Sequence, residues 1–282
     1  MLFGKLKKSL NYISVKIRNM KVSAIVPCYN EEKTVKKVVE VLLKSQWVAE
    51  VIVVNDGSTD QSLNILKSFK QQIKLIDLKK NYGKGRALAE GIKRAQEELV
   101  MFIDADLINL DQKNIADLLK PIINDHYRAV VGVRKKGRLL PAPFARLSGE
   151  RVYYKKDLLP ILDKMRQTRF GAEVLLNHAF ENIPVKKIPL LKLCGLYKHE
   201  KRTPALAVKE YLDEGVEIAK ELARQEKLKA GDLKIIERLK NAASIKELKE
   251  IIEKISNLKI REYLQKYVLK YLEKARSWWN KW

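Results

Sequence analysis

Two aspartates separated by a single alanine, Asp104 and Asp106, follow the apolar residues 99–103. An apolar run of this length is typical of a buried central strand in a parallel sheet. Ligands of open α/β sheets bind at the carboxyl edge of the strands, where both carboxylates would lie. A carboxylate pair there can hold Mg²⁺ or Mn²⁺ together with the phosphates of a substrate. The alternative is an ordinary strand-to-helix turn, with one aspartate as a helix cap and the other solvated.

Three further polar loops follow apolar runs earlier in the chain, at residues 27–32 (PCYNEE), 55–60 (NDGSTD) and 81–86 (NYGKGR). Segments with helical periodicity separate the runs. The strands that we expect are residues 22–26, ended by Pro27, and residues 50–54, 73–78, 99–104 and 129–133. This alternation predicts a doubly wound α/β sheet with right-handed crossovers. All four polar loops would then lie at one edge of the sheet.

Two common phosphate-binding patterns are missing from these loops. Residues 83–85 do not complete the P-loop pattern G-x-x-x-x-G-K-[ST], and no G-x-G-x-x-G follows the first strand. The second absence argues against a dinucleotide-binding enzyme. A nucleotidyltransferase would need a glycine-rich basic loop where this chain has PCYNEE. Each polar loop alone is an ordinary turn, but four at one edge predict a cleft for a nucleoside diphosphate.

These segments resemble those of family 2 glycosyltransferases, nucleotide-diphospho-sugar transferases with the GT-A, or Rossmann-like, fold. The matching motifs are VSAIVPCYNEE, VIVVNDGSTD, NYGKGRAL and MFIDADL, in this order and spacing. The resemblance covers about residues 22–204 and is most specific in the first half. Within the family, the chain is most similar to polyprenyl-phosphate sugar transferases and glucosyl-3-phosphoglycerate synthases.

The resemblance implies roles for individual residues of the first half. It implies that Pro27, Tyr29 and Glu31 line the nucleoside pocket, with Glu31 on the ribose. It also implies that Asp56 contacts the base and that Lys84 contacts the base or the phosphates. Asp104 and Asp106 would match the D-x-D motif that carries the diphosphate and a divalent ion, Mg²⁺ or Mn²⁺. The aspartate pair thereby becomes a predicted metal site.

The second half of the chain matches the family more loosely. Residues 147–151 (LSGER) are similar to an acceptor-side loop, and residues 170–174 (FGAEV) to a segment that opens a helix under the active site. Residues 193–199 (LCGLYKH) resemble a strand and loop that deliver a histidine, here His199, to the metal. The alternative for His199 is a surface histidine in a basic loop. Glu173 is either a catalytic or acceptor-orienting carboxylate or a buried helix-capping residue.

The predicted reaction transfers a sugar from a UDP- or GDP-linked donor to a phosphate-bearing acceptor. A divalent ion at the aspartates would neutralise the leaving diphosphate, and an acceptor phosphate, already anionic, requires no strong general base. A group of basic residues would clamp that phosphate or, alternatively, form a solvated loop: Arg134, Lys135, Lys136, Arg138 and Arg151. Polyprenyl phosphate is the favoured acceptor, and a soluble phosphoglycerate-like compound is the alternative.

The composition indicates an anionic partner. Lysine and arginine number 57 against 34 acidic residues, which gives a formal net charge of +23. Such charge is typical of proteins that bind nucleic acid, anionic membranes or phosphorylated substrates. No nucleic-acid motif accompanies it, so we expect no nucleic-acid partner. A non-catalytic membrane- or nucleic-acid-binding protein is the alternative of another class, but it leaves the aspartate pair unexplained.

We expect three regions: residues 1–21, a basic amphipathic segment; residues 22–204, the transferase domain; and residues 205–282, a helical C-terminal region. Three tryptophans among lysines at residues 278–282 suit a membrane headgroup region, as does the first segment. Packing on the transferase domain is the alternative for both, and a self-association surface is a further alternative for the C-terminal region. The chain has no apolar run near the roughly 20 residues that span a bilayer, no secretory signal and only two distant cysteines. The sequence therefore predicts a cytoplasmic protein, peripheral on the inner face of the cell membrane.

Overall fold

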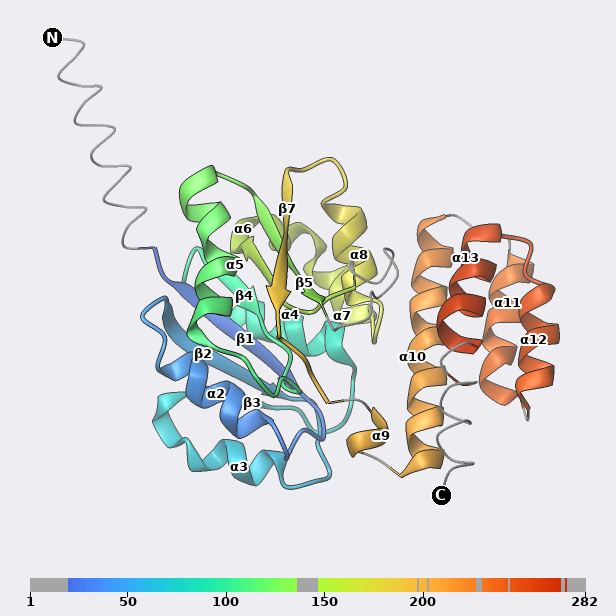
Figure 1. Ribbon diagram of the computed structural model, residues 1–282, viewed down its shortest axis with the longest axis horizontal. Helices are drawn as coiled ribbons and strands as arrows, with labels where there is room; N and C mark the ends of the chain where they lie inside the picture. Colours follow the sequence, from blue (N-terminus) through green and yellow to red (C-terminus); the bar gives the residue numbers. More distant parts are fainter. Residues whose placement is uncertain are drawn as a thin grey trace, which may run out of the picture. The chain divides into compact units, whose positions relative to one another are not determined.

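The structure is a computed structural model that describes most of the chain. The described residues are 20–135, 147–196, 198–201, 203–226, 230–242, 244–269 and 272. They form two compact units, one within Met1–Gln167 and Ala179–Gly195 and the other within Thr168–His178 and Leu196–Trp282. Figure 1 shows the sheet of the first unit and the helices of the second. The domain boundary after residue 204 stays a prediction. The second compact unit includes residues 168–178 and 196–204, which that boundary would assign to the transferase domain.

The first unit is built on a seven-stranded sheet. Its strands are β1 (Val22–Cys28), β2 (Val48–Asn55), β3 (Lys74–Asp77), β4 (Leu99–Phe102), β5 (Ala129–Lys135), β6 (Arg151–Tyr154) and β7 (Val185–Leu191). Their spatial order is β3-β2-β1-β4-β6-β5-β7. Strand β1 pairs in parallel with β2 and β4, whereas β6 runs antiparallel to both β4 and β5. The predicted α/β fold with a helical C-terminal region is confirmed, and β6 makes the sheet mixed rather than parallel throughout.

Strands β6 and β7 have no counterpart among the predicted strands. Strand β6 is the four-residue segment RVYY, which is too short for an alternating pattern to stand out. Strand β7 lies at an edge of the sheet and contains Lys186, Lys187 and Pro189. Lysine and proline protect sheet edges from pairing with other chains. Because these residues interrupt the apolar pattern, β7 is not predicted as a strand from the sequence.

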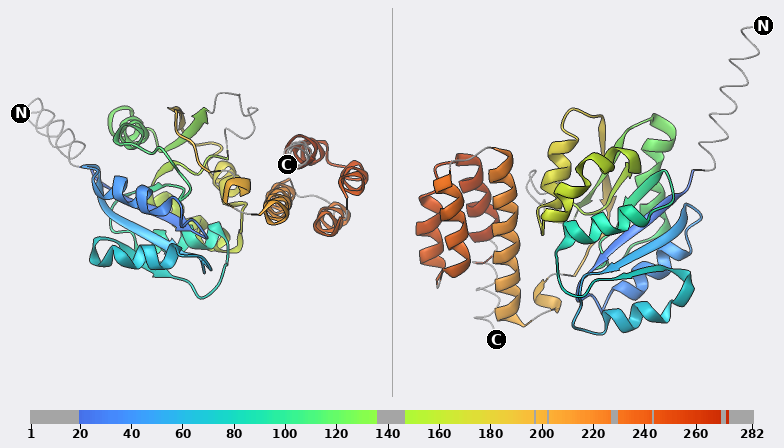
Figure 2. Two further views of the ribbon diagram at one scale, coloured as in Figure 1. Left: turned by 60° about the horizontal axis from the view of Figure 1, so that its bottom comes forward. Right: turned by 180° about the vertical axis from the view of Figure 1, so that it is seen from behind.

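Helices cover both faces of the sheet. They are α2 (Val35–Leu43), α3 (Ser62–Ser68), η1 (Lys70–Gln72), α4 (Lys84–Arg94), α5 (Gln112–Asp125), α6 (Lys155–Leu158), η3 (Leu159–Ile161) and α7 (Leu162–Gln167). Helices α2 and α5 lie on the face that Figure 1 presents, and α4 lies on the opposite face, seen from behind in Figure 2. Helix α5 begins with a capping box, in which the side chains of Asp111 and Asn114 each accept the other residue's backbone N–H.

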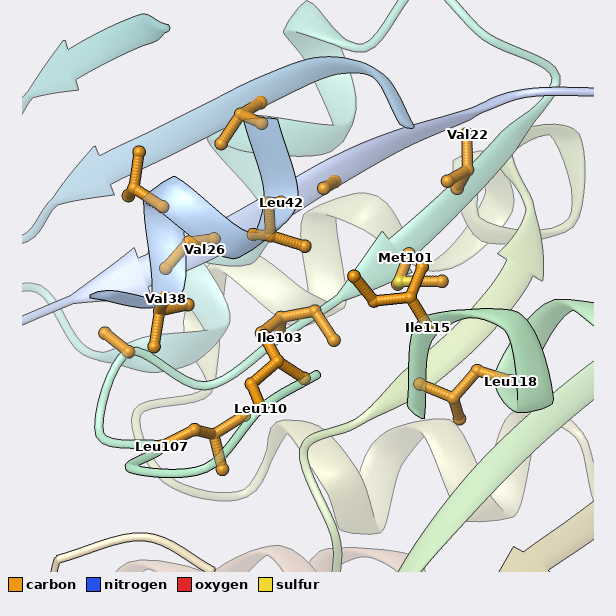
Figure 3. Packing of buried hydrophobic residues seen from close by; sticks show 14 of the residues in the cluster. Val22, Val26, Val38, Leu42, Met101, Ile103, Leu107, Leu110, Ile115 and Leu118 are labelled. Atoms are coloured by element: carbon orange, nitrogen blue, oxygen red, sulfur yellow. The ribbon is translucent and has the colours of Figure 1, made fainter. Parts of the chain in front are cut away.

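Alternate residues of β1 and β4 face α2 and α5 and form the main core. Figure 3 shows this packing, to which the strands and helices contribute Val22, Val26, Met101, Val38, Leu42, Ile115 and Leu118, all buried. Burial of one such side chain stabilises a fold by about 1.5–3 kcal/mol. On the opposite face, α4 lies so close to β1 that a Cβ atom on Gly91 would overlap Ile25. Packing on both faces fixes the end of β4, from which the aspartates follow.

Pro27 does not end β1 as predicted, because the strand continues to Cys28. The carbonyl of Ile25 accepts a hydrogen bond from Ile103 N at 3.1 Å. The backbone of Ile25 therefore faces β4, and by alternation so does the nitrogen of Pro27. Pairing with β4 ends at Ile25 and Phe102. The N–H that proline lacks would thus lie beyond the last pair, where the sheet does not require it.

The second unit is helical. Its elements are most of α8 (Ala172–Ala179), α9 (Lys198–Lys201), α10 (Pro204–Gln225), α11 (Ala230–Arg238), η4 (Leu239–Asn241), α12 (Ile245–Glu253), α13 (Leu258–Tyr263) and η5 (Leu264–Leu269). Ser244 is the N-cap of α12, and its side chain accepts a hydrogen bond from Glu247 N. Helix α10 approaches η5 at Gly215, where any Cβ atom would overlap Val268. Within the described part of the chain, no helix is both long and apolar enough to cross a membrane.

Candidate active site

The chain turns directly after β4, and the two aspartates point away from the core. Ile103, Ala105 and Leu107 are buried in the core, and the intervening Asp104 and Asp106 are half-buried. Burial of these three apolar side chains leaves both carboxylates directed out of the core. Both therefore lie at the carboxyl end of β4, as the sequence predicts.

The segment that follows β7 holds the aspartates from a second side. Leu107 and Gly195 form an antiparallel bridge, and Ile108 N donates to Cys194 O at 3.0 Å. A Cβ atom on Gly195 would lie 2.7 Å from Oδ1 of Asp106. Only glycine allows the backbone to approach the carboxylate this closely.

Two basic side chains form ion pairs with the aspartates. Lys84 is the first residue of α4, and its Nζ lies 2.6 Å from Oδ1 of Asp104. Arg134, near the end of β5, has Nη2 3.0 Å from Oδ2 of Asp104 and Nη1 3.9 Å from Oδ1 of Asp106. Between 17% and 26% of each of the four side chains is exposed. The cluster therefore combines two carboxylates with two cations at a surface that a ligand can reach.

Glu150, in the loop before β6, completes the cluster and is a residue that the sequence analysis does not single out. Its side chain is fully buried, and its Oε2 lies 3.1 Å from Nε of Arg134 and accepts a hydrogen bond from Ser148 Oγ. Burial raises the pKa of Glu150; the charge of Arg134 opposes this rise, and that of Asp104 adds to it. A glutamate among serine, glycine and arginine is typical of a solvated loop. The burial of Glu150 becomes evident only from the pairing of β6 with β4 and β5.

Asp56 braces the loop that presents Lys84. Its carboxylate is buried and accepts hydrogen bonds from Tyr82 N at 2.8 Å and Gly83 N at 2.7 Å. Gly57 has a φ of +68°, and a Cβ atom there would lie 2.7 Å from Asn81 N. The loops after β2 and β3 are thus tied together. The predicted contact of Asp56 with a base stays a prediction.

Of the predicted nucleoside residues, Pro27 lies near the end of β1, and Tyr29 and Glu31 lie in the loop that follows it. Pro27, Tyr29 and Glu31 are all half-buried. Between them, Asn30 adopts a left-handed φ of +56°, and its Oδ1 accepts from Thr59 N at 2.7 Å. Asparagine tolerates this conformation better than most residues. The bond ties the loop to the one after β2, while the contacts of the three residues with a nucleoside stay predictions.

The remaining predicted site residues are Arg151, Glu173 and a group that falls outside the described part. Arg151 is buried, and its guanidinium donates to Ser148 O and Tyr153 Oη; the prediction that it clamps an acceptor phosphate is therefore wrong. Glu173 is buried in the first turn of α8, in the second unit, and its catalytic role stays a prediction. The predictions for four other residues concern parts of the chain that the structure does not describe. His199 belongs to α9, but its side chain and that of Lys135 are outside the described part, as are Lys136 and Arg138 entirely.

Asp104 and Asp106 fit a divalent ion by their donor chemistry. Carboxylate oxygens are ligands that Mg²⁺ and Mn²⁺ prefer. Among the residues that the structure describes, no group of three or more His, Cys, Asp or Glu side chains is placed to hold a metal ion. One or two carboxylates are the usual protein contribution to a magnesium site that substrate phosphates complete. The pair therefore suits a metal–diphosphate complex.

The family model of glycosyl transferase family 2 matches residues 23–181, more than half of the chain. The chain belongs to this family. The match covers β1 to β6 and therefore includes Asp104, Asp106, Lys84, Arg134 and Glu150. The predicted family is confirmed.

Curated relatives of this family 2 glycosyltransferase include two staphylococcal enzymes. The poly-β-1,6-N-acetyl-D-glucosamine synthase of Staphylococcus epidermidis is 30% identical over 165 residues, which are 49% of this chain and 40% of that protein. The synthase of Staphylococcus aureus strain COL is 28% identical over 163 residues, 48% of this chain and 39% of that protein. The chain thus matches less than half the length of these relatives.

Among solved structures, the fold is similar to that of glucosyl-3-phosphoglycerate synthase from Mycobacterium tuberculosis. The complex of that enzyme with Mn²⁺, UDP and glucosyl-3-phosphoglycerate aligns with a TM-score of 0.61 and 20% identity, covering 78% of this chain and 85% of that one. Its complex with Mg²⁺ and UDP gives a TM-score of 0.60 and 20% identity, covering 79% and 85%. The predicted GT-A fold is thereby confirmed.

Proposed function

We propose that this chain transfers a sugar from a UDP- or GDP-linked donor to a phosphate-bearing acceptor, with Mg²⁺ or Mn²⁺ at Asp104 and Asp106. The observation that carries the proposal is the cluster after β4, where Lys84 and Arg134 meet the two aspartates. Membership in glycosyl transferase family 2 supports it. The mycobacterial synthase with the same fold, solved with Mn²⁺ or Mg²⁺ and UDP, supports it as well.

The residue types suit departure of a nucleoside diphosphate. A sugar leaves such a group readily only when the charge that develops on the diphosphate is stabilised. When bound, the divalent ion supplies this stabilisation as a Lewis acid. Lys84 and Arg134 place two further positive charges beside the aspartates and can form charge-assisted hydrogen bonds to phosphate oxygens. Asp56 holds the loop from which Lys84 projects, so that this charge is presented at a fixed place.

A phosphate-bearing acceptor suits the same charge distribution. The oxygen of a phosphate is already anionic near neutral pH, so an acceptor that attacks through it requires no strong general base. Polyprenyl phosphate is the acceptor that we place first, and a phosphoglycerate-like compound is the second. The mycobacterial synthase was also solved with phosphoglyceric acid, which supports the second choice.

A turnover screen tests the proposal. The purified chain would be incubated with UDP- and GDP-sugars and Mn²⁺, in the presence of polyprenyl phosphate in detergent micelles, 3-phosphoglycerate or oligomers of N-acetylglucosamine. We expect metal-dependent transfer to one of the two phosphate-bearing acceptors and none after addition of EDTA. Transfer to the sugar oligomers alone would replace the proposal with a polysaccharide synthase activity, as the names of the staphylococcal relatives indicate.

We also propose that the chain binds anionic membrane surfaces through its basic N-terminal segment and its Trp- and Lys-rich C-terminal residues, all outside the described part except Met20 and Lys21. Each lysine or arginine near such a surface contributes about 1 kcal/mol, and salt screens this attraction. Sedimentation with vesicles that contain or lack anionic lipid is the test. We expect binding to anionic vesicles at low salt; the absence of binding there would make a water-soluble acceptor the better choice.

A further inference from the structure

Arg134 contacts three carboxylates, and each contact uses a different nitrogen of its guanidinium. Nε lies 3.1 Å from Glu150, Nη2 lies 3.0 Å from Asp104, and Nη1 lies 3.9 Å from Asp106. We infer that Glu150 is a positioning residue that binds the Nε edge of Arg134 and so aims its two Nη groups at the diphosphate site. The inference deepens the proposed function and rests on it.

The sheet explains why Glu150 and Arg134 meet. Gly132 N, in β5, donates to the carbonyl of Glu150 at 2.8 Å, directly beyond the antiparallel pair Val131 and Arg151. Glu150 therefore stands opposite Gly132, two residues before Arg134. Residues two apart on a strand project from the same face, and diagonal neighbours across strands lie within reach of long side chains. Backbone pairing thus delivers the carboxylate to the guanidinium.

Burial makes this contact directional. Glu150 is fully buried, whereas about a quarter (24%) of the Arg134 side chain is exposed. Oε2 of Glu150 pairs with Nε of Arg134 and accepts a hydrogen bond from Ser148 Oγ. Oε1 of Glu150 is buried without a hydrogen-bond partner among the described residues. A buried carboxylate needs a paired charge, so the Nε edge of Arg134 is held inward. The Nη edge then faces the aspartates at the surface.

Loss of Glu150 would leave Arg134 attracted to Asp104 but without its anchor at Nε. A planar guanidinium held at one edge retains freedom to rotate, and the precision of its donor geometry would be lost. The binding of a diphosphate at the aspartates would weaken for that reason. A purely structural carboxylate would instead affect stability without affecting this binding.

The test combines calorimetry of UDP binding in Mn²⁺ with a double-mutant cycle. We expect Glu150→Leu and Arg134→Met each to weaken binding by about 10- to 100-fold, as loss of supporting contacts typically does. The double variant should bind within about 3-fold of Arg134→Met, because Glu150 acts through that residue. Losses that multiply in the double variant, or unchanged affinity in a folded Glu150→Leu, would overturn the inference. The matched control is Glu90→Leu, since Glu90 pairs with Arg166 at 2.7 Å in the same unit; its affinity for UDP should not change.

Glu150→Gln keeps an acceptor for Nε in case Glu150→Leu does not fold. We expect this variant to retain affinity within about 3-fold of the wild type, and a loss as large as that of Arg134→Met would contradict the positioning role. The ¹⁵N Nε–H signal of Arg134 gives a second readout that needs no nucleotide. This proton should exchange slowly in the wild type and in Glu150→Gln, and fast in Glu150→Leu. If the wild type bound neither UDP nor GDP, the proposed function would fail while the exchange rates still tested the anchor; fast exchange in the wild type would overturn the inference itself.

Discussion

Gly149 lies directly against the carboxylate of Asp104, so that a Cβ atom at position 149 would stand 2.5 Å from Asp104 Cγ. Gly195 has the same relationship with Asp106, at 2.7 Å from Oδ1. One glycine precedes β6 and the other follows β7, two segments distant in sequence. The backbone of these segments, rather than side-chain packing alone, fixes where the two aspartates lie.

We expect Gly149→Ala to displace the Asp104 carboxylate and weaken metal-dependent binding of UDP or GDP by about 10-fold or more. The added methyl group should also destabilise the fold by about 1–3 kcal/mol, as overpacking does. Calorimetry and thermal unfolding would measure the two effects. Gly231→Ala is the control, because a Cβ atom at position 231 has no neighbour within 4 Å. Equal nucleotide affinity in Gly149→Ala and wild type would contradict the close placement.

Lys84→Met should lower the affinity for nucleotide while leaving its dependence on the metal intact. The variant keeps the aliphatic stem and removes the charge that lies 2.6 Å from Asp104. Loss of a charged hydrogen bond of about 1.5–3 kcal/mol corresponds to a roughly 10- to 100-fold loss of affinity. Lys113→Met provides the comparison, since Lys113 pairs with Asp117 on an exposed face of α5. Wild-type affinity in Lys84→Met would show that this lysine pairs with Asp104 but does not contribute to nucleotide binding.

The sequence was sufficient for the part of the site that follows the strands in order. The loops after β1, β2, β3 and β4 are polar segments next to apolar runs, and parallel pairing brings their ends to one edge. Residues such as Asp104 and Lys84 could therefore be assigned to the same site from their position in the pattern. That inference needs only local periodicity and the topology rules of α/β sheets.

The remainder depended on long-range pairing that the sequence does not display. Glu150 reaches the cluster because the short strand β6 inserts between β4 and β5, and nothing in RVYY indicates this position. Arg151 has the same sequence character as Arg134, yet pairing turns it inward to Ser148 and Tyr153. Charge and spacing alone cannot distinguish a buried arginine from one at a binding surface.

The stability of the fold should depend on pH through Glu50, in β2. Burial tends to raise the pKa of this carboxyl, but hydrogen bonds from Lys74, Ser23 and Gln96 hold its pKa below the ordinary value of a glutamate. A carboxyl with a lowered pKa stabilises the fold above its unfolded pKa, and this contribution is lost as the pH falls through the folded pKa. Glu50→Gln should therefore destabilise by about 1 kcal/mol at pH 7 and by less below about pH 4.

Urea denaturation of Glu50→Gln and wild type at both pH values would measure this difference. The exposed residue Glu253 provides a control, because Glu253→Gln should change the free energy of unfolding by less than about 0.5 kcal/mol at either pH. A Glu50→Gln effect of the same size at neutral and acidic pH would mean that the hydrogen bonds do not depend on the charge.

The most direct test of the aspartate pair as a metal–diphosphate site is calorimetry of UDP and GDP with the wild type and Asp106→Asn, each in Mn²⁺ and in EDTA. Asparagine keeps the size of the side chain and removes its charge, while Asp163→Asn, at a side chain that is 91% exposed, serves as the control. We predict that Mn²⁺ tightens nucleotide binding at least about 10-fold in wild type and control, and that Asp106→Asn abolishes this gain without loss of thermal stability. An equal gain from Mn²⁺ in Asp106→Asn would contradict the assignment of the metal to this pair.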